Sequence, residues 1–277
     1  TSGCLCCTVR GDIRQTLLML HSRRENGELP KFDRVVVEST GLADPAPVIH
    51  TLMSDYFLEH HFMLNSVVTT VDVINGSSTI EKYKECEKQV TVADRIVITK
   101  SDIEKSGSAN ITMLKSELSA LNPTALIIDR HVRAFKFSNL FDASLYNPNT
   151  KTTDVRRWLS AEAASGESHK HNEHDHNHGD HHHDVTRHGT SIRSFTLILD
   201  EPIMIETFAN ALEALLLTQA SKLLRLKGIV NTVDRPGKPM VIHGVQHIFH
   251  EPVWLERWPD EDHKTKLVFI TDGIERA

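Results

Sequence analysis

The sequence predicts an α/β fold for about the first 150 residues and a small α+β domain at the carboxyl-terminal end. Short runs of β-branched and apolar residues recur in the first part, separated by helical patterns and without the strict alternation of a half-exposed strand. Strands of that kind are buried on both faces, which indicates a parallel sheet with helices on both faces. A polar, histidine-rich stretch then precedes one helical pattern and four strand-like runs.

Each element of the first part follows from its local pattern. Asp12 is expected to cap a helix that ends near Gly27. Two further helices are expected at about 80–93 and 110–121. The apolar runs predict strands within 32–40, 66–75, 94–102 and 124–130. Ligands of such sheets bind beyond the carboxyl ends of the strands, where the polar tails ESTG and TKSD fall.

Three segments are predicted along the chain: a domain over 1–150, a flexible linker over 151–190 and a second domain over 191–277. The linker has no hydrophobic period and cannot contribute to a core. The second domain is expected to have a helix at about 203–217 and strands within 192–200, 223–233, 239–250 and 265–274.

Three histidines fall in the strand-like run 239–250. Alternation along a strand would place His243 and His247 on one face and His250 on the other, as packing or surface residues rather than metal ligands. The segment 254–262 is expected to form a loop or a short helix under the sheet.

Composition narrows the classes of function. The formal charge of −6 gives no general basic surface, so neither nucleic acid nor a membrane is an expected partner. No apolar run approaches the roughly 20 residues of a membrane span. The chain opens at Thr1 without a signal-peptide pattern, which is consistent with a fragment or a trimmed product. The cysteines do not make a disulfide framework, so a reducing cytoplasmic location is expected.

The segment GCLCCTVRGD carries Cys4, Cys6 and Cys7. Adjacent cysteines rarely pair with each other, whereas Cys-x-Cys-Cys lets two or three thiolates converge on one soft ion. Three ligands with an open position suit an ion that must be released: Zn²⁺, with Cu⁺, Co²⁺ or Ni²⁺ as alternatives. A structural zinc site completed by a distant histidine, or plain buried residues, stays open. A redox role lacks a Cys-x-x-Cys pair. Cys86, on a predicted helix, is expected in the core.

Two strand-end motifs point to a nucleotide. In VVVESTGLADP, Glu38 is an acid that can hold Mg²⁺, and Gly41 lets a backbone N–H approach a terminal phosphate. In RIVITKSD, Asp102 can accept two hydrogen bonds from guanine while the stem of Lys100 covers the base. Each motif alone is weak, because a turn with a solvated acid has the same pattern. Their position in one predicted sheet favours the nucleotide interpretation.

Together these segments resemble the CobW-type metallochaperone GTPases, relatives of the UreG and HypB nickel-insertion GTPases. The resemblance covers nearly the whole chain in order and spacing. It rests on GCLCCTVRGD, VVVESTGLADP, VADRIVITKSD, the histidine-rich linker, RLKGIVN, HGVQHIFHEP and TKLVFITDGI.

The resemblance implies a P-loop GTPase fold of the SIMIBI class, GTP and Mg²⁺ as cofactors, and delivery of zinc or a similar ion to a client metalloprotein. It assigns Glu38 and Gly41 to the Mg²⁺ and γ-phosphate switch, and Thr99, Lys100 and Asp102 to guanine binding. The metal ligands it assigns are Cys4, Cys6 and Cys7. A homodimer stays open.

Two departures from the family pattern matter. The phosphate loop G-x-x-x-x-G-K-[ST], expected before the cysteines, is not in this sequence, so this chain alone is expected to hydrolyse GTP poorly, as an amino-terminally incomplete copy. Thr99 stands where the commonest GTPase pattern has asparagine, and a hydroxyl makes fewer hydrogen bonds than an amide.

The histidine-rich run predicts either loose metal binding by a solvated tail or a reservoir that raises the metal concentration beside the cysteines. The predicted function is a GTP-dependent metallochaperone whose nucleotide state controls its metal site. The alternative is a passive zinc-buffering or sensing protein with a vestigial nucleotide site. The candidate ligands in the run are His169, His171, His174, His176, His178, His181, His182 and His183.

Overall fold

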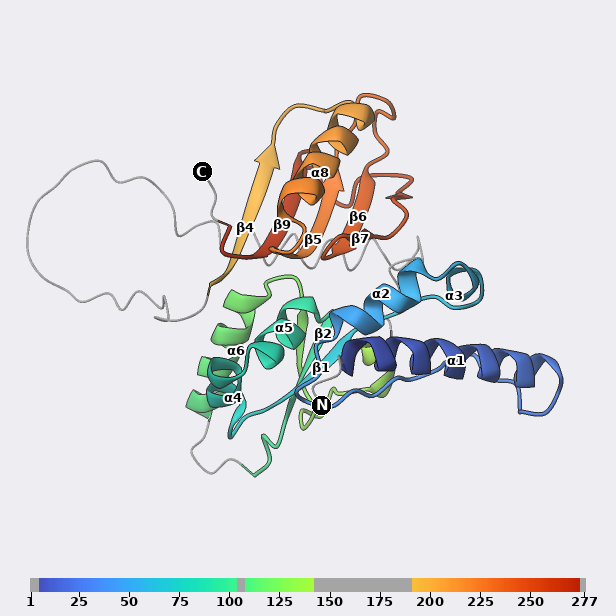
Figure 1. Ribbon diagram of the computed structural model, residues 1–277. Helices are drawn as coiled ribbons and strands as arrows, with labels where there is room; N and C mark the ends of the chain where they lie inside the picture. Colours follow the sequence, from blue (N-terminus) through green and yellow to red (C-terminus); the bar gives the residue numbers. More distant parts are fainter. Residues whose placement is uncertain (1–4, 104–107, 142–190, 275–277) are drawn as a thin grey trace, which may run out of the picture.

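The computed structural model describes residues 5–103, 108–141 and 191–274, with the side chains of the first helix described from residue 11 and those of the helix after residue 107 from residue 110. Figure 1 shows two units: a parallel-sheet unit formed by residues up to 141, and an antiparallel-sheet unit that begins at residue 191. The predicted fold class, an α/β unit followed by a small α+β domain, is confirmed.

The first unit contains a three-stranded parallel sheet in the order β1-β2-β3. In its register, Val97 lies between Thr70 and Ile128. The strands are β1 (Val68–Asp72), β2 (Arg95–Thr99) and β3 (Leu126–Asp129). The helices are α1 (Leu5–Glu25), α2 (Ala46–Ser54), α3 (Tyr56–His61), α4 (Gly76–Lys82), α5 (Lys84–Val92), α6 (Ser108–Leu121) and the short η1 (Phe137–Leu140).

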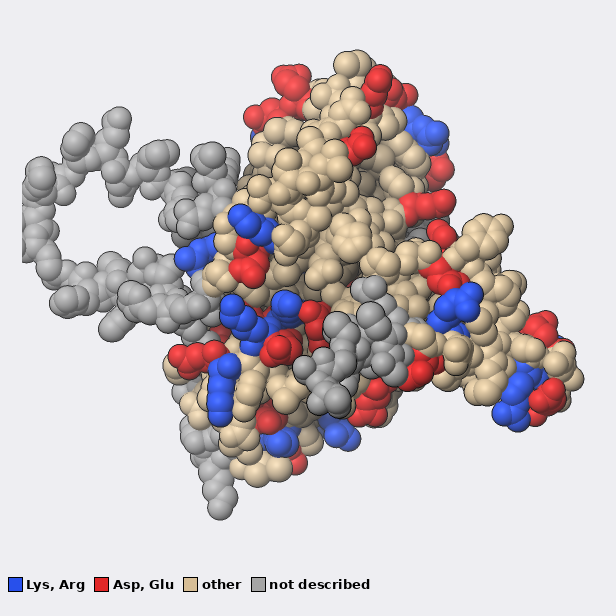
Figure 2. Space-filling view, in the orientation of Figure 1, with Lys and Arg blue, Asp and Glu red and all other residues tan. Residues whose placement is uncertain are grey.

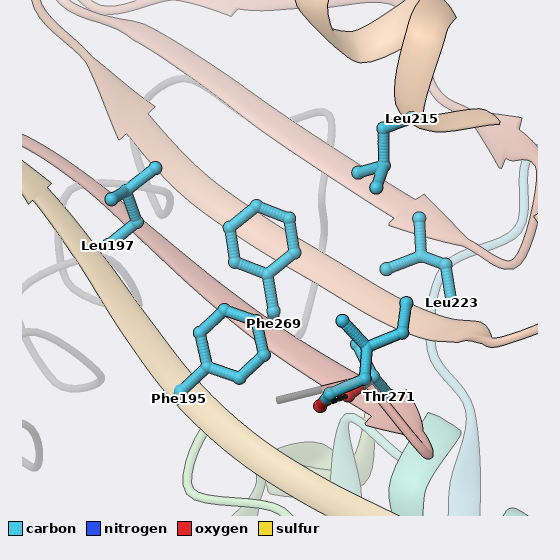
Figure 3. A pocket seen from close by; sticks show the side chains of 7 residues that line it. Phe195, Leu197, Leu215, Leu223, Phe269 and Thr271 are labelled. Carbon is cyan, nitrogen blue, oxygen red and sulfur yellow. Dashed lines mark hydrogen bonds between the residues drawn. The ribbon is translucent and has the colours of Figure 1, made fainter. Parts of the chain in front are cut away.

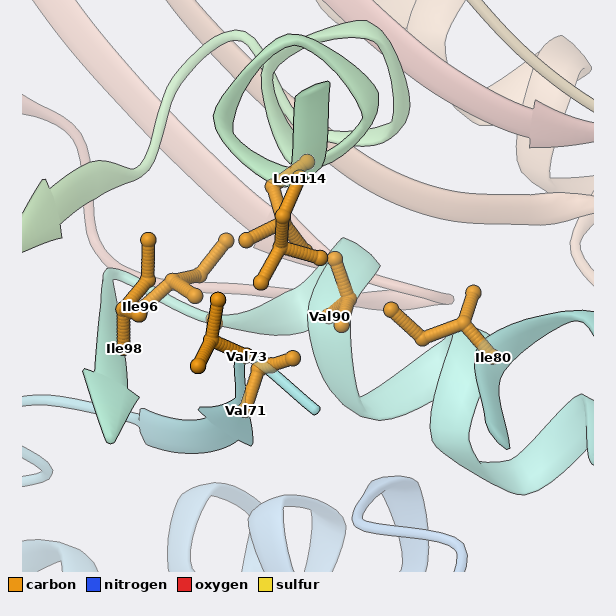
Figure 4. Packing of buried hydrophobic residues seen from close by; sticks show 9 residues of the cluster. Val71, Val73, Ile80, Val90, Ile96, Ile98 and Leu114 are labelled. Atoms are coloured by element: carbon orange, nitrogen blue, oxygen red, sulfur yellow. The ribbon is translucent and has the colours of Figure 1, made fainter. Parts of the chain in front are cut away.

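The core of the first unit lies between the sheet and helices α4, α5 and α6 (Figure 4). Ile96 and Ile98 of β2 and Leu118 of α6 are completely buried. Val71 of β1 packs with Ile96 and Ile98 of β2 against the helices on this face, and the amino-terminal helices α1 and α2 lie on the other side of the sheet (Figures 1 and 4). Burial of this apolar surface stabilises the sheet and places the carboxyl ends of its strands side by side.

The second unit is an antiparallel sheet with one long helix, α8 (Ile205–Gln219), over one face. The strand order is β4-β9-β5-β6-β7, and β8 pairs with β6. The strands are β4 (Ile192–Leu199), β5 (Leu223–Val230), β6 (Met240–Val245), β7 (Ile248–Phe249), β8 (Val253–Trp254) and β9 (Thr265–Asp272).

An apolar pocket of about 220 Å³ lies between α8 and the sheet (Figure 3). The rings of Phe195 and Phe269, opposite each other on β4 and β9, stack with centroids 5.2 Å apart. The hydroxyl of Thr271 donates to the carbonyl oxygen of Ile274 at 2.9 Å. The pocket therefore presents hydrocarbon surface and belongs to the packing of this unit.

The two units pack against each other through two apolar clusters. Leu121 of α6 packs against Ile192, Leu224 and Ile270 of the second unit. Ile49 and Val92 of the first unit pack against Val245 at the end of β6. Helix α5 lies directly below the second sheet in Figure 1.

The strand predicted within 32–40 does not form. These residues have irregular backbone, and Val36 and Val37 are 71% and 45% exposed. A β-branched run becomes a strand only when a neighbouring strand supplies the ladder, and none of the strands in the described ranges pairs with it.

Two helix predictions were also wrong in detail. Helix α1 begins at Leu5, so Asp12 lies inside it and is not its cap, although the helix ends beside Gly27 as expected. Gly11 therefore lies in the interior of the helix, where glycine lowers helix stability by about 1 kcal/mol relative to alanine. The other residues of this long helix offset that loss. The predicted helix at 80–93 is divided into α4 and α5 because Tyr83 is extended.

The run 239–250 is a hairpin, not one strand. Gln246 has a positive φ of 54°, and the chain reverses between β6 and β7. His243 and His250 are therefore both buried and stack with ring centroids 5.1 Å apart, while His247 at the turn is exposed. The predicted separation of these histidines was wrong, because strand alternation does not continue through a turn. The segment after β8 forms a loop, as expected.

Candidate functional site

The TKSD segment occupies the carboxyl end of β2 and the turn after it. Thr99 is the last residue of β2, and its carbonyl oxygen accepts a hydrogen bond from the backbone N–H of Val73 at 3.1 Å. Lys100 then has a left-handed backbone conformation with φ of 60°, which is uncommon outside glycine. The chain thus turns sharply at the edge of the sheet where ligands of parallel sheets bind.

Lys100 is paired with the end of the neighbouring strand. Its Nζ lies 3.2 Å from Oδ2 of Asp72, the last residue of β1. Oδ1 of Asp72 accepts hydrogen bonds from the backbone N–H groups of Ile74 and Asn75, at 2.9 and 2.7 Å. Burial by itself would raise the pKa of Asp72, but these hydrogen bonds and the charge of Lys100 lower it below its ordinary value. Asp72 is therefore an ionised partner that directs the Lys100 side chain.

Asp102 is connected to the end of β3. Nε2 of His131 lies 3.0 Å from Oδ1 of Asp102, whose side chain is 52% exposed. The hydroxyl of Ser101 donates to Oδ1 of Asp129 at 2.6 Å, and the backbone N–H of His131 donates to the same oxygen at 2.9 Å. Asp102 therefore presents an accessible carboxylate whose position is set by a neighbouring strand end.

The structure thus brings Thr99, Lys100 and Asp102 together, as predicted for residues of one turn. It adds their partners, which the sequence analysis did not identify: Asp72, Asp129 and His131. A signal for the two aspartates was present, because each ends an apolar run that predicts a strand.

The E-x-x-G loop lies against a helix rather than against the TKSD turn. Glu38 and Gly41 are both exposed, and a Cβ added at Gly41 would have no atom within 4 Å. Among the described residues, no hydrogen bond or ion pair joins Glu38 or Gly41 to Thr99–Asp102. The two motifs are therefore not joined by a polar contact between these described residues.

The prediction that Cys86 belongs to the core was wrong. This residue of α5 is only partly buried, and its Sγ donates to the carbonyl oxygen of Gly41 at 3.3 Å. Burial nevertheless raises the pKa of its thiol, with a smaller contribution from Glu85. The helical pattern around Cys86 could not show this contact, because Gly41 lies 45 residues away in the sequence.

The predicted metal ligands lie largely outside the described residues. Cys4 and the histidines from His169 to His183 fall there, and for Cys6 and Cys7 the structure describes only the helical backbone of α1. Within residues 11–103, 110–141 and 191–274, no group of three or more histidine, cysteine, aspartate or glutamate side chains could hold a metal ion. The thiolate site therefore stays a prediction.

Two protein-family models match this chain. A model described as CobW/HypB/UreG, nucleotide-binding domain, matches residues 1–129, and the cobalamin synthesis protein cobW C-terminal domain matches residues 192–277. The chain belongs to the CobW family. Its two matched segments coincide with the parallel-sheet and antiparallel-sheet units, which confirms the resemblance found in the sequence.

Several CobW-family relatives align with most of this chain. The zinc chaperone YjiA of Escherichia coli is 29% identical over 277 residues, covering 99% of this chain and 76% of that protein. The zinc-regulated GTPase metalloprotein activator 1 of Schizosaccharomyces pombe is 26% identical, covering 100% and 68%. The crystal structure of Zn(II)-bound YjiA GTPase superimposes with a TM-score of 0.70 at 26% identity, covering 93% of this chain and 72% of the other. In the described part of this CobW-family chain, no helix is both long and apolar enough to cross a membrane.

Proposed function

We propose that this protein is a GTP-dependent metallochaperone that binds zinc at Cys4, Cys6 and Cys7 and delivers it to a client metalloprotein. Its relatives carry the names zinc chaperone and zinc-regulated GTPase metalloprotein activator. The observation that carries the nucleotide half of this proposal is the arrangement at the carboxyl ends of β1, β2 and β3, where Lys100 pairs with Asp72 and Asp102 with His131.

Asp102 would select guanine by its hydrogen-bonding chemistry. A carboxylate accepts hydrogen bonds only, and guanine offers two donors, N1–H and the N2 amino group, on one edge. Adenine has an acceptor at N1 and is rejected there. The stem of Lys100 would cover the base, and the hydroxyl of Thr99 would bridge neighbouring groups.

Glu38 and Gly41 would serve the phosphate end of GTP. The carboxylate of Glu38 is exposed and provides the oxygen ligand that Mg²⁺ prefers, directly or through water. The open space at the Cβ position of Gly41 leaves room for a terminal phosphate to approach its backbone. When bound, Mg²⁺ would neutralise charge on the phosphates.

The zinc cargo would be held by soft thiolates, which require a reducing compartment such as the cytoplasm. The run from His169 to His183 would supply weaker imidazole ligands near by. Co²⁺ and Ni²⁺ are alternative cargoes, because three thiolates do not select strictly among these ions. Release to the client would follow a change at Glu38 and Gly41, since the cysteines at the start of α1 precede these residues with only that helix and a short irregular stretch between them.

The nucleotide half is tested by Asp102→Asn. Loss of a charge-assisted pair should weaken GTP binding by about 2 kcal/mol, roughly thirtyfold. The new amide N–H₂ can donate to the C2 carbonyl of xanthine, so binding of xanthosine triphosphate should improve. Glu81→Gln, an exposed acid on α4, is the matched control. Unchanged discrimination between GTP and xanthosine triphosphate would refute the guanine assignment.

The metal half is tested with Cys6→Ala in the full-length protein. Zinc stoichiometry should fall, and the response of GTP turnover to zinc should disappear. A passive buffer would instead bind zinc equally well with and without GTP, and its turnover would ignore both zinc and Cys6.

A further inference from the structure

Helix α5 holds the E-x-x-G loop through one side chain in particular. Nε2 of Gln89 donates toward three backbone carbonyl oxygens of the loop, those of Thr40 at 3.3 Å, Gly41 at 3.2 Å and Ala43 at 2.7 Å. An amide nitrogen carries two hydrogens, so the three oxygens converge on one group and share its donors. The loop backbone is therefore folded around the end of the Gln89 side chain.

Two other side chains of α5 hold the flanks of the same loop. Sγ of Cys86 lies 3.3 Å from the carbonyl oxygen of Gly41. Nζ of Lys88 lies 2.9 Å from Oδ2 of Asp44, and Oδ1 of Asp44 accepts the backbone N–H of Ala46 at the start of α2. The loop thus contacts α5 between residues 40 and 44.

Helix α5 is itself a rigid support. The backbone carbonyl of Gln89 accepts a hydrogen bond from the hydroxyl of Thr69 on β1 at 2.8 Å. At the end of the helix, the carbonyl of Val92 accepts a hydrogen bond from the guanidinium of Arg225 on β5. Val90, next to Gln89, is 1% exposed in the core. The Gln89 side chain therefore extends from a helix anchored to both sheets.

The hydrogen bond to Thr40 has a consequence for Gly41. The peptide unit between them is planar and trans, so its C=O and N–H point in opposite directions. Because Gln89 binds the carbonyl oxygen of Thr40, the N–H of Gly41 is directed away from α5. The same oxygen accepts a hydrogen bond from the backbone N–H of Ala43 at 3.1 Å, so a rotation of this peptide unit would break both contacts.

We propose that Gln89 is a positioning residue for nucleotide hydrolysis, which orients the backbone N–H of Gly41 toward the terminal phosphate. The proposal rests on the function proposed above for Gly41. Gln89 does not touch the nucleotide, and it acts through the peptide unit that joins Thr40 to Gly41. Its removal takes away the side-chain contact of that peptide unit, leaving it the turn hydrogen bond from the backbone N–H of Ala43, and does not alter the Lys100 and Asp102 turn.

The first measurement follows the contact itself. The sequence has four cysteines, so replacing Cys4, Cys6 and Cys7 with serine leaves Cys86 as the sole thiol, and Ellman's reagent then reports its accessibility. Gln89→Met keeps the size of the side chain and removes its donors. Labelling of Cys86 should become about tenfold faster, which corresponds to a loss of about 1.4 kcal/mol in the contact between the loop and α5. Lys84→Gln, exposed on the same helix, should leave the rate unchanged.

The second measurement separates positioning from folding. In the full-length protein with its cysteines intact, Gln89→Met should lower kcat for GTP about tenfold while KM and the affinity for a fluorescent GDP analogue change less than about twofold. Lys88→Met loosens the same loop from a partly exposed position and should lower kcat in the same direction, so the test does not depend on one variant folding.

The outcomes are distinguishable. If the unmodified full-length protein binds no guanine nucleotide, the proposed function fails and this inference fails with it. If it binds and hydrolyses GTP but Gln89→Met and Lys88→Met leave kcat unchanged, or raise KM instead of lowering kcat, the role of Gln89 alone is overturned.

Discussion

The guanidinium of Arg225 on β5 donates a hydrogen bond to the carboxylate of Asp94, just before β2, and the two side chains are 1% and 2% exposed. Nζ of Lys227 lies 3.2 Å from Oδ1 of Asp94. Oδ2 of Asp94 accepts a hydrogen bond from the backbone N–H of Val67 at 3.0 Å. Burial by itself would raise the pKa of Asp94, but the charges of Arg225 and Lys227 lower it well below its usual range. An ionised carboxylate of the first unit therefore binds two cations of the second.

Replacing Asp94 should destabilise the whole chain. Asp94→Asn keeps the size of the side chain but leaves Arg225 and Lys227 buried without a counter-charge. Breaking a buried ion pair from one side costs about 3–5 kcal/mol. Urea unfolding followed by circular dichroism should show a decrease of that size in the free energy of unfolding, and both units should be destabilised.

A double-mutant cycle provides the control for Asp94. Asp94→Asn combined with Arg225→Met should cost clearly less than the sum of the two single substitutions, because the uncompensated guanidinium is removed. Lys238→Gln breaks a pair with Glu256 that is 49% and 86% exposed, and should have almost no effect. Strict additivity at Asp94 and Arg225 would contradict a coupled pair.

Asp72 should contribute to nucleotide affinity but not to the preference for guanine over adenine. Asp72→Asn retains an oxygen that accepts the N–H groups of Ile74 and Asn75 but removes the charge beside Lys100. The pair is partly exposed, so affinity for GDP should fall only about threefold to fivefold. Fluorescence titration should show the same preference for guanine over adenine, because Asp102 is intact. A collapse of that preference would move base recognition from Asp102 to Asp72.

Glu87 should lower the stability of the native protein at neutral pH. Its side chain is 6% exposed, and within the described residues its Oε1 has no hydrogen-bond partner. Burial, and then the charge of Asp272 on β9, raise its pKa, so the ionised form is disfavoured in the folded state. Glu87→Gln should therefore raise the melting temperature at pH 7 by a few degrees.

The gain from Glu87→Gln should depend on pH. As the pH falls through the raised pKa of Glu87, the native protein takes up a proton there and the advantage of glutamine disappears. Glu81→Gln, an exposed acid on α4, should show no gain at any pH. A gain that persists unchanged to low pH would assign the effect to packing rather than charge.

Local sequence pattern was sufficient to predict a strand where the residues are buried and a neighbouring strand pairs with them. The run Arg95–Thr99 forms β2 because its β-branched residues are covered on both faces and a strand lies on each side. Val36 and Val37 carry the same pattern, yet they form no ladder, because a strand needs a neighbour that local sequence does not specify. The hairpin after β6 was missed for a related reason: the positive φ of Gln246 occurs at a residue that carries no turn signal.

In the candidate site, too, some residues could be proposed from local sequence, whereas others could be found only from the fold. Lys100 and Asp102 could be proposed as site residues from residue type and position after a strand, because both are local properties. Their partners Asp72 and His131 come from other strands, so only the order of strands in the sheet brings them into contact. Gln89 was not identified at all, since its three acceptors lie more than 40 residues away and are backbone atoms without a sequence signature.

His250 should make the protein sensitive to mild acid. Burial lowers its pKa from 6.5 to about 4, although the charge of Asp94 opposes this. The unfolded chain therefore binds a proton at His250 near pH 6.5, and the native protein only near pH 4. The stability provided by the neutral ring is complete above about pH 6.5 and is lost as the pH falls to about 4, by about 3 kcal/mol in all.

His250→Gln removes this titration. The free energy of unfolding, measured by urea at pH 7 and pH 4.5, should fall between these pH values by about 2 kcal/mol less in the variant than in the unmodified protein. Comparing the two proteins cancels the other groups that titrate in this interval, including Glu87 on α5, whose raised pKa acts in the opposite direction. His60→Gln, exposed on α3, should leave the pH dependence as it was. Equal pH dependence in the His250 variant and the unmodified protein would mean that the ring is protonated in the native interface, beside Asp94, at pH 4.5.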